Sequence, residues 1–504
     1  MSLTRKMFSN SVYLFLDLLT VNFLGLFFWF FTGRFLLPDE VGIVSTSINL
    51  ALLLSSLSLL GFQGVLPKLI PEYLEKKQNK KIVTLSRFTL KVILISNTII
   101  ILILLLFSSI IQSILKIPFQ ALAFSTALLL SFTFSTFFGC IMLGFQNMRL
   151  FFFTDLIGTI MKLLLTILLL TLGYGYIGPL TGVLIGYILI DLRRFRKSWF
   201  FPSNKEEIDG KELFSNYALP YFTSLIAGLV FSNFQIVLLA SLQGQYVTGG
   251  YSIAFLIASV ISIIPGVLSQ ALFPIISMLS VGKKIKKQSY LIQLVFRYAV
   301  FVMLPAATFL IFFSNPILLL LRKEYIEVGN VLSILTIASF FFGLGNIFLS
   351  SLYAIGKTKL NRNIWIACAL IFLLISPIFI NIYSSHGLAI SYLVSSTIFL
   401  FLGYHFIKKL TLLKINWKNL SKLILAFLLL LIFFKIADII QANLIIKILF
   451  AILGGVSYLL ALIPLRFYTK EDVRILSIIS EKLPFGKKQL LFLIDLLSNW
   501  LEEK

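Results

Sequence analysis

The amino-acid sequence predicts an all-α integral membrane protein with about 14 transmembrane helices, arranged as two parallel six-helix repeats followed by a further helix pair. Three observations support this fold class. Hydrophobic residues make up 59% of the 504 residues and charged residues only 12%, too little charge for the surface of a soluble chain of this length. Apolar runs of the roughly 20 residues that a spanning helix needs recur along the chain. A pattern at the N-terminus also returns near residue 214.

The repeat is recognised by spacing rather than by residue identity. Phe8-Ser9-Asn10 recurs as Phe214-Ser215-Asn216, Gly42 as Gly250 and Pro67 as Pro274, at offsets of 206, 208 and 207 residues. Parallel repeats of membrane helices are typical of secondary transporters, in which the substrate site lies between the halves. We therefore divide the chain into an N-terminal six-helix bundle (1–206), a C-terminal six-helix bundle (207–410), an additional transmembrane helix pair (411–465) and a cytoplasmic amphipathic tail (466–504).

Each expected helix is an apolar run between polar turns. The expected spans are 12–34, 41–63, 92–114, 121–145, 153–172, 176–192, 215–240, 248–272, 296–320, 328–352, 364–383, 386–406, 423–440 and 445–465. In the tail, apolar residues recur at helical spacing between Leu490 and Leu501. That pattern predicts a helix that lies in the inner membrane interface or packs on the cytoplasmic loops.

Basic residues orient the chain in the membrane. If the N-terminus is inside, the segments on that side hold 36 of the 43 Lys and Arg. Positively charged short loops face the cytoplasm, so we expect a multi-pass protein of the cytoplasmic membrane with both termini in the cytoplasm. The net charge of +23 does not indicate nucleic-acid binding, because the basic residues sit in short clusters between apolar runs.

Polar residues follow one side of the first, second, seventh and eighth helices, which are equivalent pairs of the repeat. Packing between helices in lipid explains stripes of Ser and Gly. Asn49 and Gln63 in the second helix, and Asn233 and Gln235 in the seventh, are harder to explain by packing. We expect these four side chains to line a wet cavity and to bind substrate.

A few charges lie at membrane depth, where they are costly and usually functional. Lys162 lies midway along the fifth helix, and Asp155, seven residues earlier, is two turns away. The functional interpretation places Lys162 at a cavity; the structural one pairs it with Asp155 or another carboxylate. Arg297, at the start of the ninth helix, either points into the centre or merely ends the helix. Asp17 lies on the polar side of the first helix and is a candidate for coupling or gating.

Several classes of function and site are disfavoured. Lys435 and Asp438 are spaced to pair with each other near the outer end of the thirteenth helix. His386 and His405 have no plausible metal partner, and Cys140 and Cys368 lie in apolar segments, so we expect neither a metal site nor a disulfide. There is no GxxxxGK[ST] phosphate loop. No loop is long enough for an active site, so we expect neither a cofactor nor an enzyme.

The sequence resembles the polysaccharide transporters, the Wzx-type flippases of the MATE/MOP superfamily, over residues 8 to about 465. The resemblance begins in the run Asn10–Ser45. The matching motifs are Gly33-Arg34-Phe35-Leu36-Leu37-Pro38-Asp39-Glu40-Val41-Gly42, Gly61-Phe62-Gln63 with Pro67, Gly144-Phe145-Gln146, Leu219-Pro220, Phe273-Pro274-Ile275-Ile276-Ser277 and Gly356-Lys357-Thr358-Lys359.

This resemblance implies two six-helix bundles around a V-shaped central cavity, with the first, second, seventh and eighth helices prominent in its lining. It implies a cargo of undecaprenyl- or dolichyl-diphosphate-linked oligosaccharide, moved from the inner to the outer leaflet. The seventh helix of such proteins often ends in an Asp-Arg pair. Here the corresponding stretch is Asn233-Phe234-Gln235, so ion coupling through that acid is not expected.

A lipid-linked glycan flippase is therefore the preferred function, working by alternating access. Lys162 and Arg297 are the candidates for the diphosphate, and Asn, Gln, Ser and Tyr side chains for the sugars. The alternative is an ion-coupled multidrug exporter of the same superfamily, for which Asp17 is the one deep acid. A membrane-embedded glycan polymerase or ligase would need a large external loop, and the repeat disfavours a mere scaffold. The expected partners are the lipid-linked oligosaccharide, membrane lipids and H⁺ or Na⁺, and we expect a monomer.

Overall fold

The computed structural model of the chain describes residues 3–198, 209–414, 416–440, 444–469, 472–473 and 477, and within these ranges the regular secondary structure is helical. Eleven of the described helices are long and apolar enough to cross a membrane. One of them, α16, is bent at Ser384 and contains two of the expected spans. The helices α8 and α18 cover the remaining two. The expected all-α membrane fold with about 14 passes is confirmed.

The helices of the first half run from α1 to α8, and those of the second half from α9 to α16. The first half contains α1 (Leu3–Phe35), α2 (Pro38–Ser58), α3 (Phe62–Glu75), α4 (Asn79–Leu106), α5 (Ser108–Leu115), α6 (Phe119–Gly144), α7 (Met148–Thr171) and α8 (Ile177–Ser198). The second half contains α9 (Gly210–Leu213), η1 (Phe214–Ala218), α10 (Leu219–Leu229), η2 (Val230–Phe234), α11 (Gln235–Gln243), α12 (Gln245–Val281), α13 (Ile285–Phe312), α14 (Ser314–Leu321), η3 (Lys323–Val328), α15 (Gly329–Ala354) and α16 (Thr358–Thr411). A final pair, α17 (Trp417–Ile439) and α18 (Leu444–Ala461), follows.

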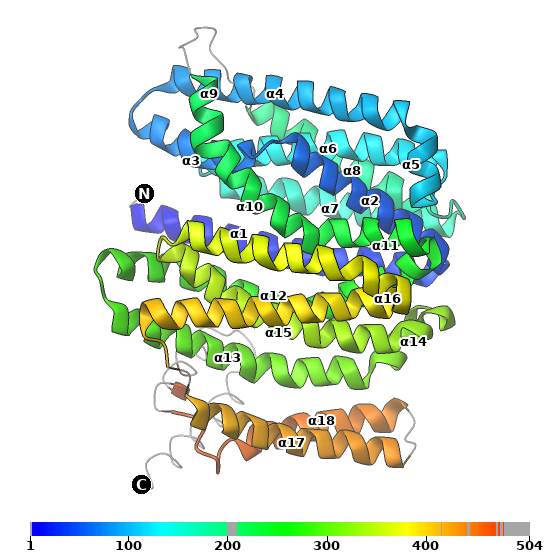
Figure 1. Cartoon of the computed structure of the whole chain (residues 1–504), viewed down its shortest axis with the longest axis vertical. Helices are drawn as coiled ribbons and strands as arrows, with labels where there is room; N and C mark the ends of the chain where they lie inside the picture. The colour runs from blue at the N-terminus through cyan, green and yellow to red at the C-terminus, as the bar shows by residue number, and fades with distance from the viewer. Residues whose placement is uncertain are drawn as a thin grey trace.

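The two halves lie side by side with their long helices roughly parallel (Figure 1). The helices α3 to α8 occupy the upper part of that view, and α12 to α15 the lower part. The helix α1 runs across the middle, packs mainly on α7 and reaches α12 and α14 of the other half. The pair α17–α18 lies at the lower edge, where α17 packs on α13.

Two expected single helices are each broken at the same point of the repeat. The expected span 92–114 is divided between α4 and α5 at Phe107, and 296–320 is divided between α13 and α14 at Phe313. Both phenylalanines leave the helical region, with φ, ψ of −102°, 20° and −94°, 15°. Hydropathy cannot reveal such a break, because the run stays apolar through it. The breaks lie 206 residues apart, which supports the repeat.

The basic segment expected as a loop between the second and third spans is mostly helical. It forms α3 and the first turns of α4, with a turn at residues 76–78. Gly61 begins α3 with φ = 86°, a left-handed conformation that glycine adopts without strain. This segment brings Lys68 over the ring of Tyr217 at 4.4 Å, so α3 also touches the other half.

The charged pair expected within α17 is wrong. Asp438 binds Lys447 of α18, with 2.9 Å between Oδ1 and Nζ, rather than Lys435. The turn between α17 and α18 places the two helix ends next to each other, which spacing along one helix does not reveal. The expected tail helix around Leu490–Leu501 lies outside the described residues.

Candidate functional site

The helices α2 and α12 cross closely and join the two halves. A side chain at Gly42 would overlap the carbonyl oxygen of Gln245, and one at Gly249 would overlap that of Pro38. These two contacts are equivalent at an offset of 207 residues, so Gly249, rather than Gly250, corresponds to Gly42. One turn further along, Ser45 Oγ donates to Ser252 Oγ at 2.7 Å, again 207 residues apart. The crossing therefore lies on the pseudo-twofold axis of the repeat.

Further hydrogen bonds close the same end of the molecule. Gln245 accepts a hydrogen bond from Thr46 Oγ1 at 2.9 Å, and its Nε2 donates to the carbonyl oxygen of Leu115 at the end of α5. The carbonyl groups at a helix C-terminus lack partners within the helix, so a side chain from the other half that supplies a donor holds the two ends together.

A reciprocal arginine contact joins α1 to the end of α14. Arg34 Nη1 donates to the carbonyl oxygen of Leu321 at 2.9 Å, and Arg322 Nη1 donates to that of Phe35 at 3.3 Å. Each cation thus lies at the negative end of the other half's helix, which is the favourable arrangement for a helix dipole. Together with the α2–α12 crossing, these contacts close the end of the molecule that carries the turn 36–37.

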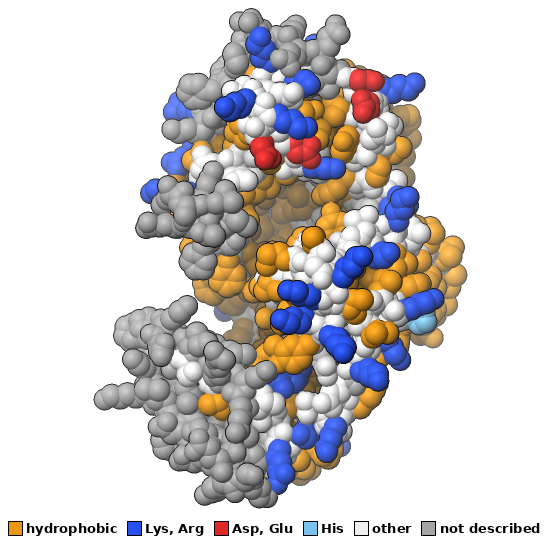
Figure 2. All heavy atoms as spheres, turned by 90° about the vertical axis from the view of Figure 1, so that its left-hand side faces the viewer, with side chains coloured by type: hydrophobic (Ala, Val, Ile, Leu, Met, Phe, Trp, Pro, Cys, Tyr) orange, Lys and Arg blue, Asp and Glu red, His pale blue; other side chains and the backbone are white. Residues whose placement is uncertain are grey.

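The opposite end is hollowed. Figure 2 shows a deep depression between the two halves on the face at the left of Figure 1, with hydrophobic side chains along the visible part of its wall. Lys and Arg side chains surround it and far outnumber Asp and Glu on this face. The turns between α12 and α13 and between α15 and α16 lie here. The basic segments predicted for one side of the membrane are thus gathered on the face with the opening.

Asn49 and Asn233 connect the halves at membrane depth. Asn233 Nδ2 donates to Asn49 Oδ1 at 3.0 Å, and Asn49 Nδ2 donates to the carbonyl oxygen of Ser45 at 2.8 Å. Both side chains are half-buried. Asn233 belongs to η2, a π-helical turn, and such turns are frequent at functional sites. The two amides therefore lie where a movement between the halves would separate them.

Gln235 and Gln63 have different surroundings. Gln235 is fully buried; its Oε1 accepts a hydrogen bond from Tyr251 OH at 2.9 Å, so this amide serves the packing of α11 on α12. Gln63 is half-buried at the start of α3, where its carbonyl oxygen lies 3.4 Å from Cys140 Sγ. Polar residues of the second and seventh helices thus divide between contacts across the halves and contacts within one half.

Lys162 lies inside the first half, between α1 and α8. Its Nζ is 5.1 Å from the centre of the Phe28 ring, and its Cβ faces Gly186 of α8. Among the described residues no carboxylate lies within ion-pair distance of this ammonium. The structural interpretation, an ion pair with Asp155, is wrong because Asp155 binds Arg194 at 2.7 Å.

Arg194 organises a buried charged cluster that the sequence reasoning missed. Its Nε donates to Thr154 Oγ1 at 3.1 Å, its Nη1 donates to the carbonyl oxygen of Ser135 at 3.1 Å, and its side chain is 3% exposed. Positioned as the last basic residues of an expected cytoplasmic loop, Arg193 and Arg194 look alike. The signal was periodicity, because only Arg194 continues the buried side of α8.

Asp17 joins this cluster from α1. It lines a cavity of about 280 Å³ together with Asp155 and Arg194. Its Oδ1 is buried and has no hydrogen-bond partner within the part of the chain that the structure describes. Two carboxylates and one guanidinium thus share the cavity, and that leaves room for one more cation. No set of three metal-ligating residues occurs among the described residues.

Arg297 has a partner within the chain. It forms an ion pair with Asp472, which also accepts a hydrogen bond from Tyr298 OH. Asp472 and Thr469 cap each other's backbone groups, with 2.7 Å between Thr469 N and Asp472 Oδ2. Arg297 therefore anchors the segment after α18 to α13, and its charge is already neutralised.

The comparisons with known proteins fit this geometry. A family model described as "Polysaccharide biosynthesis protein" matches residues 7–280. No curated protein sequence matches the chain significantly. Among solved structures, the lipid II flippase MurJ in an inward closed conformation superposes with a TM-score of 0.69 at 19% identity, over 90% of this chain and 98% of that one.

Multidrug transporters share the fold as well. The MATE multidrug transporter DinF-BH, in a complex with a small ligand, gives a TM-score of 0.60 at 16% identity, over 82% of this chain and 98% of that one. A mutant of the Vibrio cholerae MATE transporter VcmN gives 0.51 at 16% identity, over 81% and 97%. At these identities the likeness establishes the fold, and the expected two-bundle MATE/MOP architecture is confirmed.

Proposed function

The chain belongs to the polysaccharide biosynthesis protein family, and from this premise we propose that it is a flippase for a lipid-diphosphate-linked oligosaccharide. The cargo moves from the inner to the outer leaflet by alternating access. The protein is then a transporter rather than an enzyme. The observation that carries the proposal is the one-sided opening: a hollow between the halves on the basic face (Figure 2), and closure at the opposite end by the α2–α12 crossing.

The basic face is the cytoplasmic one in this proposal, with both termini inside the cell. Short loops rich in Lys and Arg stay in the cytoplasm, and the hollow then opens toward the leaflet in which lipid-linked glycans are made. A cysteine at Lys284, between α12 and α13, should be labelled by an impermeant thiol reagent only after lysis. Labelling in intact cells would reverse the orientation.

Lys162 is the proposed contact for the diphosphate. A half-buried ammonium without a carboxylate partner suits a phosphate ligand, for which Lys serves as a point charge. The Phe28 ring over it belongs to α1, which borders the seam between the halves, so a shift of α1 would uncover the ammonium. Asn49 and Asn233 are proposed to meet sugar hydroxyls once their mutual hydrogen bond opens. Arg297 is left out, because Asp472 occupies it.

The Asp17–Asp155–Arg194 cavity is the proposed coupling site. One guanidinium balances one of two carboxylates, so the site attracts a proton or Na⁺, whose gradient supplies the energy. Asp17 lies on α1, and α1 contacts both halves. Binding of a cation at Asp17 therefore links the ion to the helix that covers Lys162.

The decisive experiment is complementation of a strain that lacks its own copy of this gene, scored by surface glycan at matched protein levels. Lys162→Arg should keep part of the export, Lys162→Ala should impair it and Lys162→Glu should abolish it. Lys435→Glu, on the exposed side of α17, is the matched control and should export normally. Full export by Lys162→Glu would remove Lys162 from the site.

The same strain separates the flippase from the drug exporter, the second candidate, which the shared MATE fold and the acid cluster favour. Vesicles that contain the purified protein should move an undecaprenyl-diphosphate-linked oligosaccharide across the bilayer without clearing a lipophilic cationic dye. Dye efflux that needs Asp17, with no movement of the lipid, would establish the exporter instead.

A further inference from the structure

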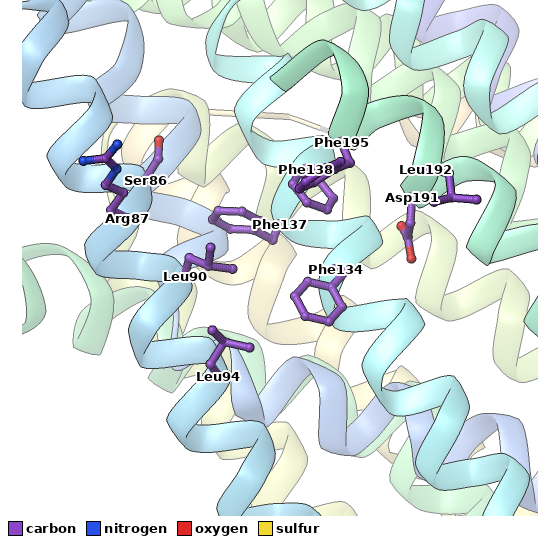
Figure 3. Close-up of a pocket in the computed structure, with 10 residues that line it drawn as sticks. All are labelled: Ser86, Arg87, Leu90, Leu94, Phe134, Phe137, Phe138, Asp191, Leu192 and Phe195. Carbon is purple, nitrogen blue, oxygen red and sulfur yellow. The ribbon is translucent and has the colours of Figure 1, made fainter. Parts of the chain in front are cut away.

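A second cavity lies on the first half, away from the seam. It has a volume of about 460 Å³ and is lined by α4, α6 and α8, with no residue from α2 or α12. Figure 3 shows α4 as one wall, α8 as the opposite wall and the phenylalanines of α6 between them. The residues are Ser86, Arg87, Leu90, Leu94, Phe134, Phe137, Phe138, Asp191, Leu192 and Phe195. This volume suits a small ligand or a lipid chain.

The chemistry of the walls changes along the groove. Leu90, Leu94 and Phe134 make one end apolar, and Leu94 and Leu192 are 46% and 55% exposed at its lips. In the proposed orientation, Ser86 and Arg87 lie about 11 to 12 Å from the cytoplasmic start of α4 at Asn79. That depth is where headgroups meet the hydrocarbon of the inner leaflet. The apolar end then lies in the hydrocarbon, and the polar end lies among the headgroups.

The polar end carries two opposite charges and a hydroxyl. Arg87 on α4 and Asp191 on α8 stand on opposite walls (Figure 3), too far apart for an ion pair with each other. No carboxylate lies within ion-pair distance of Arg87 among the described residues. Ser86 is 1% exposed, and its Oγ, like Asp191 Oδ1, is buried without a hydrogen-bond partner in the described part of the chain. Buried polar groups normally have partners.

We propose that this groove binds one zwitterionic membrane phospholipid with a primary ammonium headgroup. One acyl chain lies along Leu90, Leu94 and Phe134. The phosphate binds Arg87 and Ser86, and the ammonium binds Asp191. Charge complementarity selects this occupant, because an anionic phospholipid would leave Asp191 facing a negative headgroup, and an uncharged lipid would satisfy neither charge.

The test uses native mass spectrometry of the delipidated, detergent-solubilised full chain, titrated with dioleoyl phosphatidylethanolamine or dioleoyl phosphatidylglycerol. The wild type should retain one phosphatidylethanolamine at least tenfold more tightly than phosphatidylglycerol. Arg87→Gln and Asp191→Asn should each weaken phosphatidylethanolamine binding about tenfold, because each removes one charge-assisted contact. Asp191→Asn should also bring the two affinities together.

Two further variants keep the outcome independent of folding. Lys91→Gln, one turn along α4 and outside the groove lining, removes the same charge and should bind phosphatidylethanolamine like the wild type. Leu94→Trp fills the apolar end without touching the charges and should prevent retention while the protein stays monodisperse. Equal affinity for both lipids in the wild type, or retention by Leu94→Trp, would overturn the proposal.

Discussion

The α2–α12 crossing can be opened by a single methyl group. A Cβ at position 249 would overlap the carbonyl oxygen of Pro38 and lie 2.8 Å from the nitrogen of Gly42. Both neighbours are helix backbone, which cannot rotate away as a side chain can. Overpacking of this kind costs about 1–3 kcal/mol. Gly249→Ala therefore destabilises the closed end relative to the open one, and that energy corresponds to a roughly 5- to 150-fold shift between the two states.

The assay is the rate at which an impermeant thiol reagent labels a cysteine at Ser45, from outside intact cells. Ser45 is 1% exposed in the closed structure, so labelling reports opening. Cys140 and Cys368 are first replaced by alanine. The Gly249→Ala background should label roughly 5 to 150 times faster than the parent.

Gly266→Ala is the matched control, because it lies on the same helix and a Cβ there would meet nothing within 4 Å. Both substitutions raise helix propensity by about the same amount, roughly 1 kcal/mol, so their difference isolates the contact with α2. Equal labelling rates in the Gly249→Ala and Gly266→Ala proteins would refute the assignment of this crossing as the closed end.

Three more predictions test the charged clusters. Arg194→Gln should lower the free energy of unfolding by about 3–5 kcal/mol, because it leaves the Asp155 carboxylate buried without a counter-charge; adding Asp155→Asn should recover much of the loss in denaturant titrations, and a double variant no more stable than the single one would contradict the pair. Asp17→Asn should leave protein levels near normal but lower glycan export, measured at the cell surface, whereas loss of the protein from the membrane would mark Asp17 as structural. Arg297→Gln should make the segment after α18 more susceptible to limited proteolysis and leave export intact, since its partner is Asp472; a loss of export with unchanged proteolysis would return Arg297 to the substrate site.

The comparison of sequence and structure is instructive at Lys162 and Arg297. Both were singled out because charges at membrane depth are rare and costly. The cost itself can be read from the sequence, but the partner that offsets it cannot. Asp472 lies 175 residues after Arg297 and neutralises it, whereas Asp155, only seven residues before Lys162, is taken by Arg194. Separation along the chain says little about which charges meet when helices pack in three dimensions.

The sequence by itself determined the class of fold, the number of passes and the repeat. Apolar length and the spacing of the motifs are properties of the chain, and a bilayer admits few backbone solutions other than complete helices. Only the tertiary structure decided which polar residues face the other half. Ser45 and Ser252, or Asn49 and Asn233, become neighbours through the crossing of two helices. That crossing depends on the close approach at Gly42 and Gly249, and hydropathy does not record how near two backbones come.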